Sequence, residues 1–209
     1  MKNLYKNILR IQNGLYRRLR PVGPRQISAR LRLIFQKPKY TSKVFCIGFN
    51  KTGTTSCGKA LEMLGYRHST FNQKVWRKHY KNNEIVKILQ YAAKFDSLDD
   101  LPWLKEDMIP ILDRVFPDSK FVYLTRDENL WKKSMYNWTY KMTGEYPDLD
   151  EKLEEFRNHR EFVLDYFEDR SKEQFLVLDV SDADAFQTLV KFLGKVSNNN
   201  AFPRINVTN

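Results

Sequence analysis

The fold is decided by the stretch Val44-Phe45-Cys46-Ile47-Gly48-Phe49-Asn50-Lys51-Thr52-Gly53-Thr54-Thr55-Ser56. An apolar run ends at a glycine, and a short polar turn follows. Gly53 then opens a predicted helix that continues to Leu64. A strand, a turn and a helix in this order form a cradle for an anion, because free backbone N–H groups and the positive end of the helix dipole both point at the turn.

The two glycines of this stretch have the spacing of the ATP-binding P-loop, G-x-x-x-x-G-K-[ST]. Gly48 and Gly53 fit that pattern, but Thr54 stands where the pattern requires a lysine. The lysine lies earlier in the turn, at Lys51. We therefore predict a loop that binds a phosphate-like group but not the usual magnesium nucleotide.

Composition indicates a globular domain with a basic arm. The 209 residues are 42% hydrophobic and carry a net charge of +11, which favours anionic ligands. Much of that charge is local, since residues 1–43 contain Lys and Arg but no Asp or Glu. We divide the chain into a basic amphipathic arm over residues 1–42 and one domain over residues 43–209.

The arm has apolar residues at helical spacing, which predicts a basic amphipathic helix over residues 3–20. The residues are Leu4, Ile8, Ile11, Leu15 and Leu19. Two interpretations are open: the helix packs on the domain, which we favour, or it contacts an anionic membrane surface peripherally. A nucleic-acid partner is not expected, because no known binding module is present.

The sequence contains no apolar run of the length that a membrane span needs, and arginines interrupt the N-terminal segment where a signal peptide would be apolar. We therefore expect a cytoplasmic protein. Cys46 and Cys57 are interpreted as small core residues. No zinc-ligand spacing is found, so no metal is expected.

Predicted strands alternate with predicted helices from Lys43 onward. The strands fall at residues 43–49, 66–69, near 96, 120–125 and 175–179. This alternation predicts an α/β fold, a mostly parallel central sheet with helices on both faces. Ligands bind such sheets at the carboxyl ends of the strands, where we place Lys51, Asp96 and Arg126.

A second anion-binding element follows the strand at 120–125. Arg126 stands at its end, and Ser134 comes about two helical turns later. An arginine at a strand end can hold a phosphate through two hydrogen bonds, and a serine hydroxyl can add a third. The alternative is a structural ion pair between Arg126 and Asp127 or another neighbour.

Taken together, these elements resemble the sulfotransferases that use 3′-phosphoadenosine 5′-phosphosulfate (PAPS). Three blocks over about residues 43–207 carry the resemblance: residues 48–56, residues 121–127 with Ser134, and residues 202–207. The pattern Asp-x-x-x-Asp-x-Pro-Trp at residues 96–103 is similar to a P-loop sulfotransferase-like branch of the family. The resemblance implies a three-layer α/β/α sandwich and PAPS as the donor.

The resemblance also implies which residues bind the donor. The 5′-phosphosulfate would be bound by the first block, through Asn50, Lys51, Thr52, Gly53, Thr54, Thr55 and Ser56. Arg126 and Ser134 match the residues that hold the 3′-phosphate in the family.

Sulfuryl transfer needs a group that neutralises the leaving oxygen and a base for the acceptor. Lys51 is our candidate for the first role. For the base we rank Asp100 first, Asp96 close behind it, and His68 third. Helix capping ahead of Pro102 is the structural alternative for Asp100, and packing is the alternative for His68.

Two other functions are weighed against this one. A P-loop kinase or NTPase would use Phe175–Asp179, which imitates a magnesium-binding strand. A family member that binds PAPS without turnover is the second. The sequence does not identify the acceptor, for which carbohydrate, lipid, peptide tyrosine and small phenol all remain open.

Overall fold

The computed structural model describes residues 42–199 and 201–203 of the chain. The basic helix predicted over residues 3–20 lies outside this range. In chain order the elements are β1 Val44–Cys46, α3 Thr54–Met63, β2 His68–Ser69, the π-helix η1 Val75–Tyr80, α4 Ile85–Ala92, β3 Ser97–Asp99, α5 Ile109–Val115, β4 Lys120–Leu124, α6 Glu128–Thr143, α7 Leu149–Tyr166, β5 Phe175–Leu178 and α8 Ala185–Phe192.

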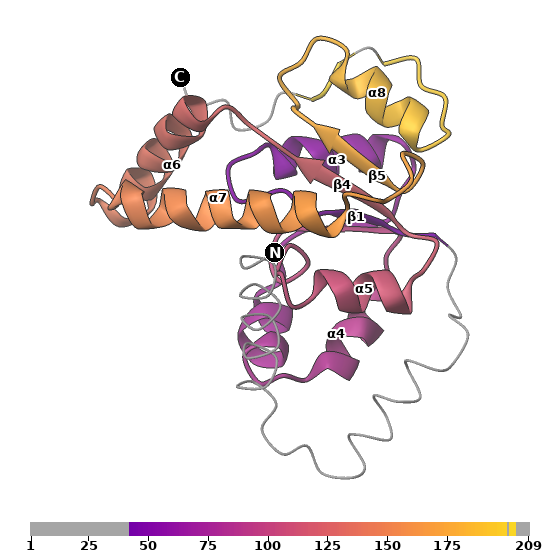
Figure 1. Ribbon diagram of the computed structural model, residues 1–209, viewed down its shortest axis with the longest axis horizontal. Helices are drawn as coiled ribbons and strands as arrows, with labels where there is room; N and C mark the ends of the chain where they lie inside the picture. The colour runs from indigo at the N-terminus through magenta and orange to yellow at the C-terminus, as the bar shows by residue number, and fades with distance from the viewer. Residues whose placement is uncertain (1–41, 200, 204–209) are drawn as a thin grey trace.

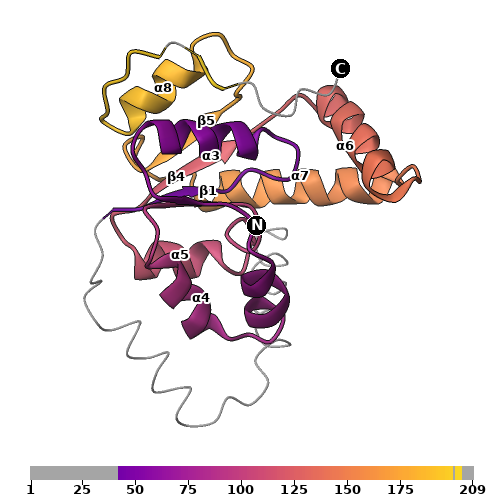
Figure 2. The same ribbon diagram turned by 180° about the vertical axis from the view of Figure 1, so that it is seen from behind.

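The five strands form one sheet in the order β2-β3-β1-β4-β5, and every neighbouring pair is parallel. Figure 1 shows α3 and α8 on one face of the sheet and α4 and α5 on the other. The same layers are seen from behind in Figure 2. The predicted α/β sandwich with a parallel central sheet is therefore confirmed.

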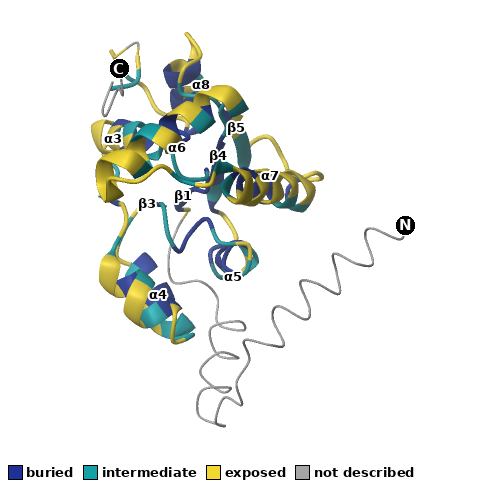
Figure 3. Ribbon diagram, turned by 90° about the vertical axis from the view of Figure 1, so that its left-hand side faces the viewer, coloured by how far each residue is buried: buried dark blue, intermediate teal, exposed yellow. Residues whose placement is uncertain are grey.

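Alternation along the strands explains why both faces are covered. In β1, Phe45 points into the core that contains α4 and α5, while its neighbours Val44 and Cys46 point into the core under α3 and α8. All three residues are buried. A strand that is apolar on both sides needs a helix layer on each face. Figure 3 shows this from the left-hand side of Figure 1, with exposed residues on the outer surfaces of the helices.

Some predicted element boundaries differ from the structure. The third strand begins at Ser97, after Asp96. The predicted helix that starts at Pro102 and Trp103 is shorter, since turns occupy the chain up to Met108 and α5 begins at Ile109. No helix in the described part of the chain is long and apolar enough to cross a membrane.

The topology places the candidate site. β1 lies at the centre of the sheet between β3 and β4. Because these strands are parallel, the loops that follow Cys46, Asp99 and Leu124 leave the sheet at the same edge. Those loops contain Lys51, Asp100 and Arg126.

Candidate active site at the phosphate-binding loop

The loop between β1 and α3 is closed on itself. The backbone N–H and the hydroxyl of Thr52 both donate to the Phe49 carbonyl oxygen, at 3.3 and 2.7 Å. Lys51 and Gly53 adopt left-handed backbone angles, with φ of 71° and 99°. We expected the Thr52 hydroxyl to donate to the ligand. In the structure it donates to the Phe49 carbonyl oxygen instead, so this side chain fixes the loop.

Close packing explains why both loop positions are glycines. A Cβ atom at Gly48 would lie 2.5 Å from the Leu124 Cβ and 2.6 Å from the Thr52 Oγ1. A Cβ atom at Gly53 would lie 2.5 Å from a methyl group of Val180. The loop is therefore pressed against the ends of β4 and β5, and any side chain at these positions would move it.

The N-terminus of α3 is open to an anion. Gly53 is the N-cap residue, and no side chain caps the helix. The first N–H groups of a helix have no acceptor within the helix, and the helix dipole favours negative charge there. Thr54, Thr55 and Ser56 supply these N–H groups. Their arrangement fits the phosphate end of a nucleotide.

Three side chains from later in the sequence hold the loop by its carbonyl groups. Arg126 Nη1 donates to the Lys51 oxygen at 2.8 Å, and Trp131 Nε1 donates to the Asn50 oxygen at 2.8 Å. His159 Nε2 donates to the Ile47 oxygen at 2.7 Å. Sequence reasoning missed the roles of Trp131 and His159, because the spacing of a helix does not show which loop it will contact.

Lys51 lies at the mouth of this loop. Its Nζ is 5.4 Å from the ring centroid of Trp138, on α6. Burial, followed by the nearby charge of Arg126, lowers the pKa of the Lys51 ammonium. An ammonium in this environment gains from an incoming anion, because the anion offsets both effects.

Arg126 and Ser134 belong to consecutive parts of the chain. Arg126 comes two residues after the end of β4, and Ser134 is buried on α6. The ion pair that we considered for Arg126 with Asp127 is not found in the described part of the chain. Asp127 instead caps α6, accepting from the N–H groups of Asn129 and Leu130 at 2.9 and 3.0 Å.

Asp100 stands at the end of β3, next to β1. Its neighbour Asp99 pairs with Cys46 in the sheet, so Asp100 is level with the residue before Gly48. The Asp100 backbone is left-handed, with φ of 65°, and its Oδ1 accepts from the Leu101 N–H at 2.6 Å. Burial raises the pKa of the Asp100 carboxyl, and the charge of Asp99 adds to this effect.

Asp96 does not lie where we expected it. The predicted strand would have ended there, but Asp96 precedes β3 and lies at the opposite edge of the sheet from the loop. Its Oδ2 accepts from the Arg67 N–H at 3.0 Å. The strand is about 3.3 Å long per residue, so the length of β3 separates Asp96 from the site. A catalytic role for Asp96 is therefore a wrong expectation.

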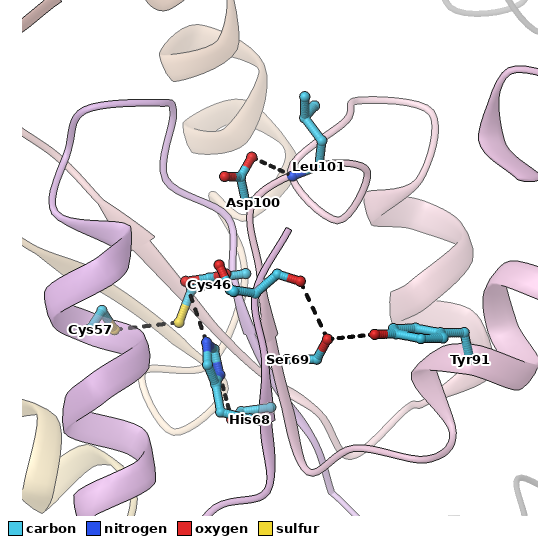
Figure 4. Close-up of polar contacts among 10 residues, drawn as sticks. Cys46, Cys57, His68, Ser69, Tyr91, Asp100 and Leu101 are labelled. Carbon is cyan, nitrogen blue, oxygen red and sulfur yellow. Dashed lines mark hydrogen bonds and ion pairs between the residues drawn. The ribbon is translucent and has the colours of Figure 1, made fainter. Parts of the chain in front are cut away.

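His68 is also removed from the loop mouth. It lies on β2 with its side chain buried under α3, where Nδ1 is 2.9 Å from the Ser97 hydroxyl. Nε2 lies 3.4 Å from Asp99 Oδ2. Figure 4 shows His68 beside the helix that carries Cys57, and Asp100 away from both. His68 is thus a packing residue, as the structural alternative had it, and not a base that a substrate can reach.

The buried pair of His68 and Asp99 was not foreseen. Asp99 is fully buried, and neither of its carboxylate oxygens has a hydrogen-bond partner among the residues that the structure describes. The pair is covered by Gly58 of α3, at which a Cβ atom would lie 2.4 Å from the His68 Nε2. Glycine is required here because the helix passes directly over the imidazole.

The cysteines are core residues, as predicted. Cys46 and Cys57 are both fully buried, with sulfur atoms 3.4 Å apart and no disulfide. Within residues 42–199 and 201–203, no cluster of His, Cys, Asp or Glu side chains could hold a metal ion.

Comparison with known proteins gives one family match. A family model described as a sulfotransferase domain matches residues 43–149, just over half of the chain. No curated protein matches the sequence at a significant level. Among solved structures, the chain is similar to the crystal structure of a gluconokinase from Sinorhizobium meliloti 1021. The sequences are 17% identical, with a TM-score of 0.47, over 74% of this chain and 93% of that one.

Proposed function

Because the chain belongs to the sulfotransferase domain family, we propose that it transfers a sulfuryl group from PAPS to a hydroxyl or amine of an acceptor. The observation that carries the proposal is that Arg126 lies against Lys51 in the loop that leads into α3, whose N-terminus no side chain caps. Arg126 binds the carbonyl of Lys51, beside the uncapped N-terminus of α3. This arrangement supplies two cations and several N–H donors to one anionic ligand.

The loop would hold the 5′ end of the donor. The N–H groups of Thr54, Thr55 and Ser56 would donate to it, and the dipole of α3 favours an anion there. PAPS would supply the sulfuryl group and leave as 3′-phosphoadenosine 5′-phosphate. Arg126 and Ser134 are the proposed site for the 3′-phosphate, on the strength of the family resemblance.

Lys51 would stabilise the leaving group. In the transfer, the acceptor oxygen forms a bond to sulfur, the bond between sulfur and the bridging oxygen breaks, and the electron pair stays on the phosphate. The Lys51 ammonium would neutralise this developing charge, and no metal would then be needed for that task. The burial of Lys51 strengthens the interaction, because water screens it less.

Asp100 would take the proton of the acceptor. It is the acidic residue at the end of β3, next to the strand that leads into the loop. Its raised pKa makes it a better base than an ordinary aspartate, since base strength grows with pKa. With Asp96 and His68 excluded by their positions, Asp100 is the remaining candidate of the three.

The kinase alternative would use Asp179 as its magnesium ligand. Asp179 follows β5, an edge strand that β4 separates from β1. Its carboxylate accepts hydrogen bonds from the N–H and hydroxyl of Ser181, at 2.9 and 2.6 Å. The carboxylate is therefore engaged in a local turn.

The test is isothermal titration of 3′-phosphoadenosine 5′-phosphate, the donor product, in parallel with ATP and magnesium. We expect the bisphosphate to bind and ATP to bind far more weakly. Lys51→Ala and Arg126→Ala should each lower the affinity by roughly 10- to 100-fold, the equivalent of losing charged hydrogen bonds. Arg114→Ala is the matched control, an exposed arginine of α5 near the opposite edge of the sheet.

Three results separate the hypotheses. Binding of the bisphosphate that depends on Lys51 and Arg126 supports the proposal. Binding of ATP and magnesium alone would refute it in favour of a kinase. If the bisphosphate binds as proposed but donor turnover is absent with all acceptor classes, the chain is a binding protein of the family and not an enzyme.

A further inference from the structure

Trp138 contacts the Lys51 side chain, which its spacing in the sequence does not show. It lies on α6 one helical turn after Ser134, so both residues lie on the same side of the helix. The Lys51 Nζ is 5.4 Å from its ring centroid, within the range of a cation–π contact. Trp138 is 40% exposed, so it is not a core residue.

Apart from Trp138, the described residues offer the Lys51 ammonium little electrostatic stabilisation. Within the described part of the chain no carboxylate forms an ion pair with it, and the nearby charge of Arg126 is of the same sign. Burial and Arg126 both lower the pKa of its ammonium. The negative face of the indole is the group that the structure offers to this cation.

An aromatic ring suits this position better than a carboxylate would. A carboxylate would repel an anionic ligand and would occupy the N–H donors of Lys51. A ring face attracts the ammonium without accepting a directed hydrogen bond, so the three N–H groups stay available for phosphate oxygens. It also restricts the long side chain, which otherwise loses conformational freedom when a ligand binds.

We propose that Trp138 is a positioning residue for Lys51, holding its ammonium at the mouth of the loop with its donors directed to an incoming phosphate group. This inference rests on the proposed function for the identity of the ligand. It predicts that removing the ring weakens ligand binding, although Trp138 need not touch the ligand.

The first test is titration of 3′-phosphoadenosine 5′-phosphate into wild type, Trp138→Ala, Trp138→Phe and Tyr140→Ala. We expect Trp138→Ala to bind about two- to fivefold more weakly, the equivalent of an exposed cation–π contact. Trp138→Phe keeps a ring and should recover most of the affinity. Tyr140→Ala is the matched control, because Tyr140 is an exposed aromatic residue of α6 that stacks on Tyr146 and not on Lys51.

The second test observes the contact directly. Lysines are dimethylated with ¹³C, and the Lys51 signal is identified by its loss in Lys51→Arg. In the unliganded protein the indole ring should shift this signal, and Trp138→Ala should return it to the position of the other lysines. A change of fold would move many signals, whereas loss of the contact moves one.

Failure of this inference differs from failure of the proposed function. If the wild type binds the bisphosphate but Trp138→Ala binds equally well or more tightly, Trp138 does not position Lys51. If the wild type does not bind the bisphosphate, the proposed function fails. Inorganic pyrophosphate titrated into the same four proteins then tests the positioning by itself, with the same expected order and the same overturning result.

Discussion

The guanidinium of Arg126 donates a hydrogen bond of 2.8 Å to the main-chain oxygen of Lys51. Arg126, one candidate ligand-binding residue, therefore also holds the backbone of Lys51, the other candidate, in place. A guanidinium carries five donors, and this bond uses one of them. A ligand that binds both residues would meet a loop whose backbone is already fixed, and pre-organisation of this kind reduces the entropic cost of binding.

Trp131→Phe should lower the stability of the protein. Trp131 is fully buried, and its Nε1 is the donor to the Asn50 oxygen. Phenylalanine would leave that acceptor without its partner, at a cost of about 1–3 kcal/mol in the free energy of unfolding. Urea denaturation measures the change. Trp138→Phe is the control, because the exposed indole of Trp138 adds little to the core, and equal stability of the two variants would contradict the prediction.

Gly58→Ala should be destabilising although alanine is the better helix former. The new Cβ atom would lie 2.4 Å from the His68 Nε2 and 3.1 Å from the Asp99 Oδ2. Overpacking of this kind costs about 1–3 kcal/mol. The double variant with His68→Ala should recover part of the loss, because the imidazole is then absent. A thermal melt of Gly58→Ala at or above the wild-type temperature would show that the helix shifts without cost.

The His159 imidazole should make the protein less stable in acid. Burial lowers its pKa from the ordinary 6.5 to about 4. Between these values the unfolded chain binds a proton that the folded protein does not, so stability is fully present above pH 6.5 and falls as the pH drops towards 4. In His159→Gln the side chain can still donate to the Ile47 oxygen but does not titrate.

Measurement of the unfolding free energy at several pH values between 4 and 7 tests this prediction. The slope of wild type against pH should exceed the slope of His159→Gln. Parallel curves for the two proteins would assign the acid sensitivity to other groups.

Asp100 should make the turnover rate fall at acidic pH, which gives the pH–rate profile an acidic limb. A carboxylate acts as a base only when ionised, and burial raises the pKa of this one. Once an acceptor is found, the turnover rate should fall below a pH that is higher than the ordinary aspartate value of 3.8. Asp100→Asn should lower the rate by about 10²- to 10⁴-fold and remove this limb, with donor binding kept. A variant that retains the limb would exclude Asp100 as the base.

The sequence predicts the sheet and the loop well because both depend on local patterns. The apolar stretches around Phe45 and Phe121 are buried on both sides, which is the mark of a central parallel strand. Close contacts require glycine at positions 48 and 53. The P-loop spacing of the two glycines points to such a loop before the contacts are known. The positions of Lys51 and Arg126 could be predicted because ligands bind at the carboxyl ends of parallel strands, and both residues come shortly after such an end.

Other parts of the site depend on contacts between distant residues. The error over Asp96 came from a strand boundary displaced by a few residues, which is enough to move a side chain to the other edge of the sheet. The contacts of Trp131, Trp138 and His159 depend on how α6 and α7 pack, and no spacing in the sequence reports this. The pairing of His68 with Asp99 likewise needs the strand order, since the two residues lie on neighbouring strands that are far apart in the chain.

The bond from His159 to the Ile47 oxygen has a consequence for the order in which the site can form. The segment that forms the loop is residues 47–53, but Arg126, Trp131 and His159 hold it from the second half of the chain. A ribosome adds the loop well before it adds its supports. A nascent chain that stops before residue 159 lacks one of these supports, so its loop is less firmly held than that of the finished protein.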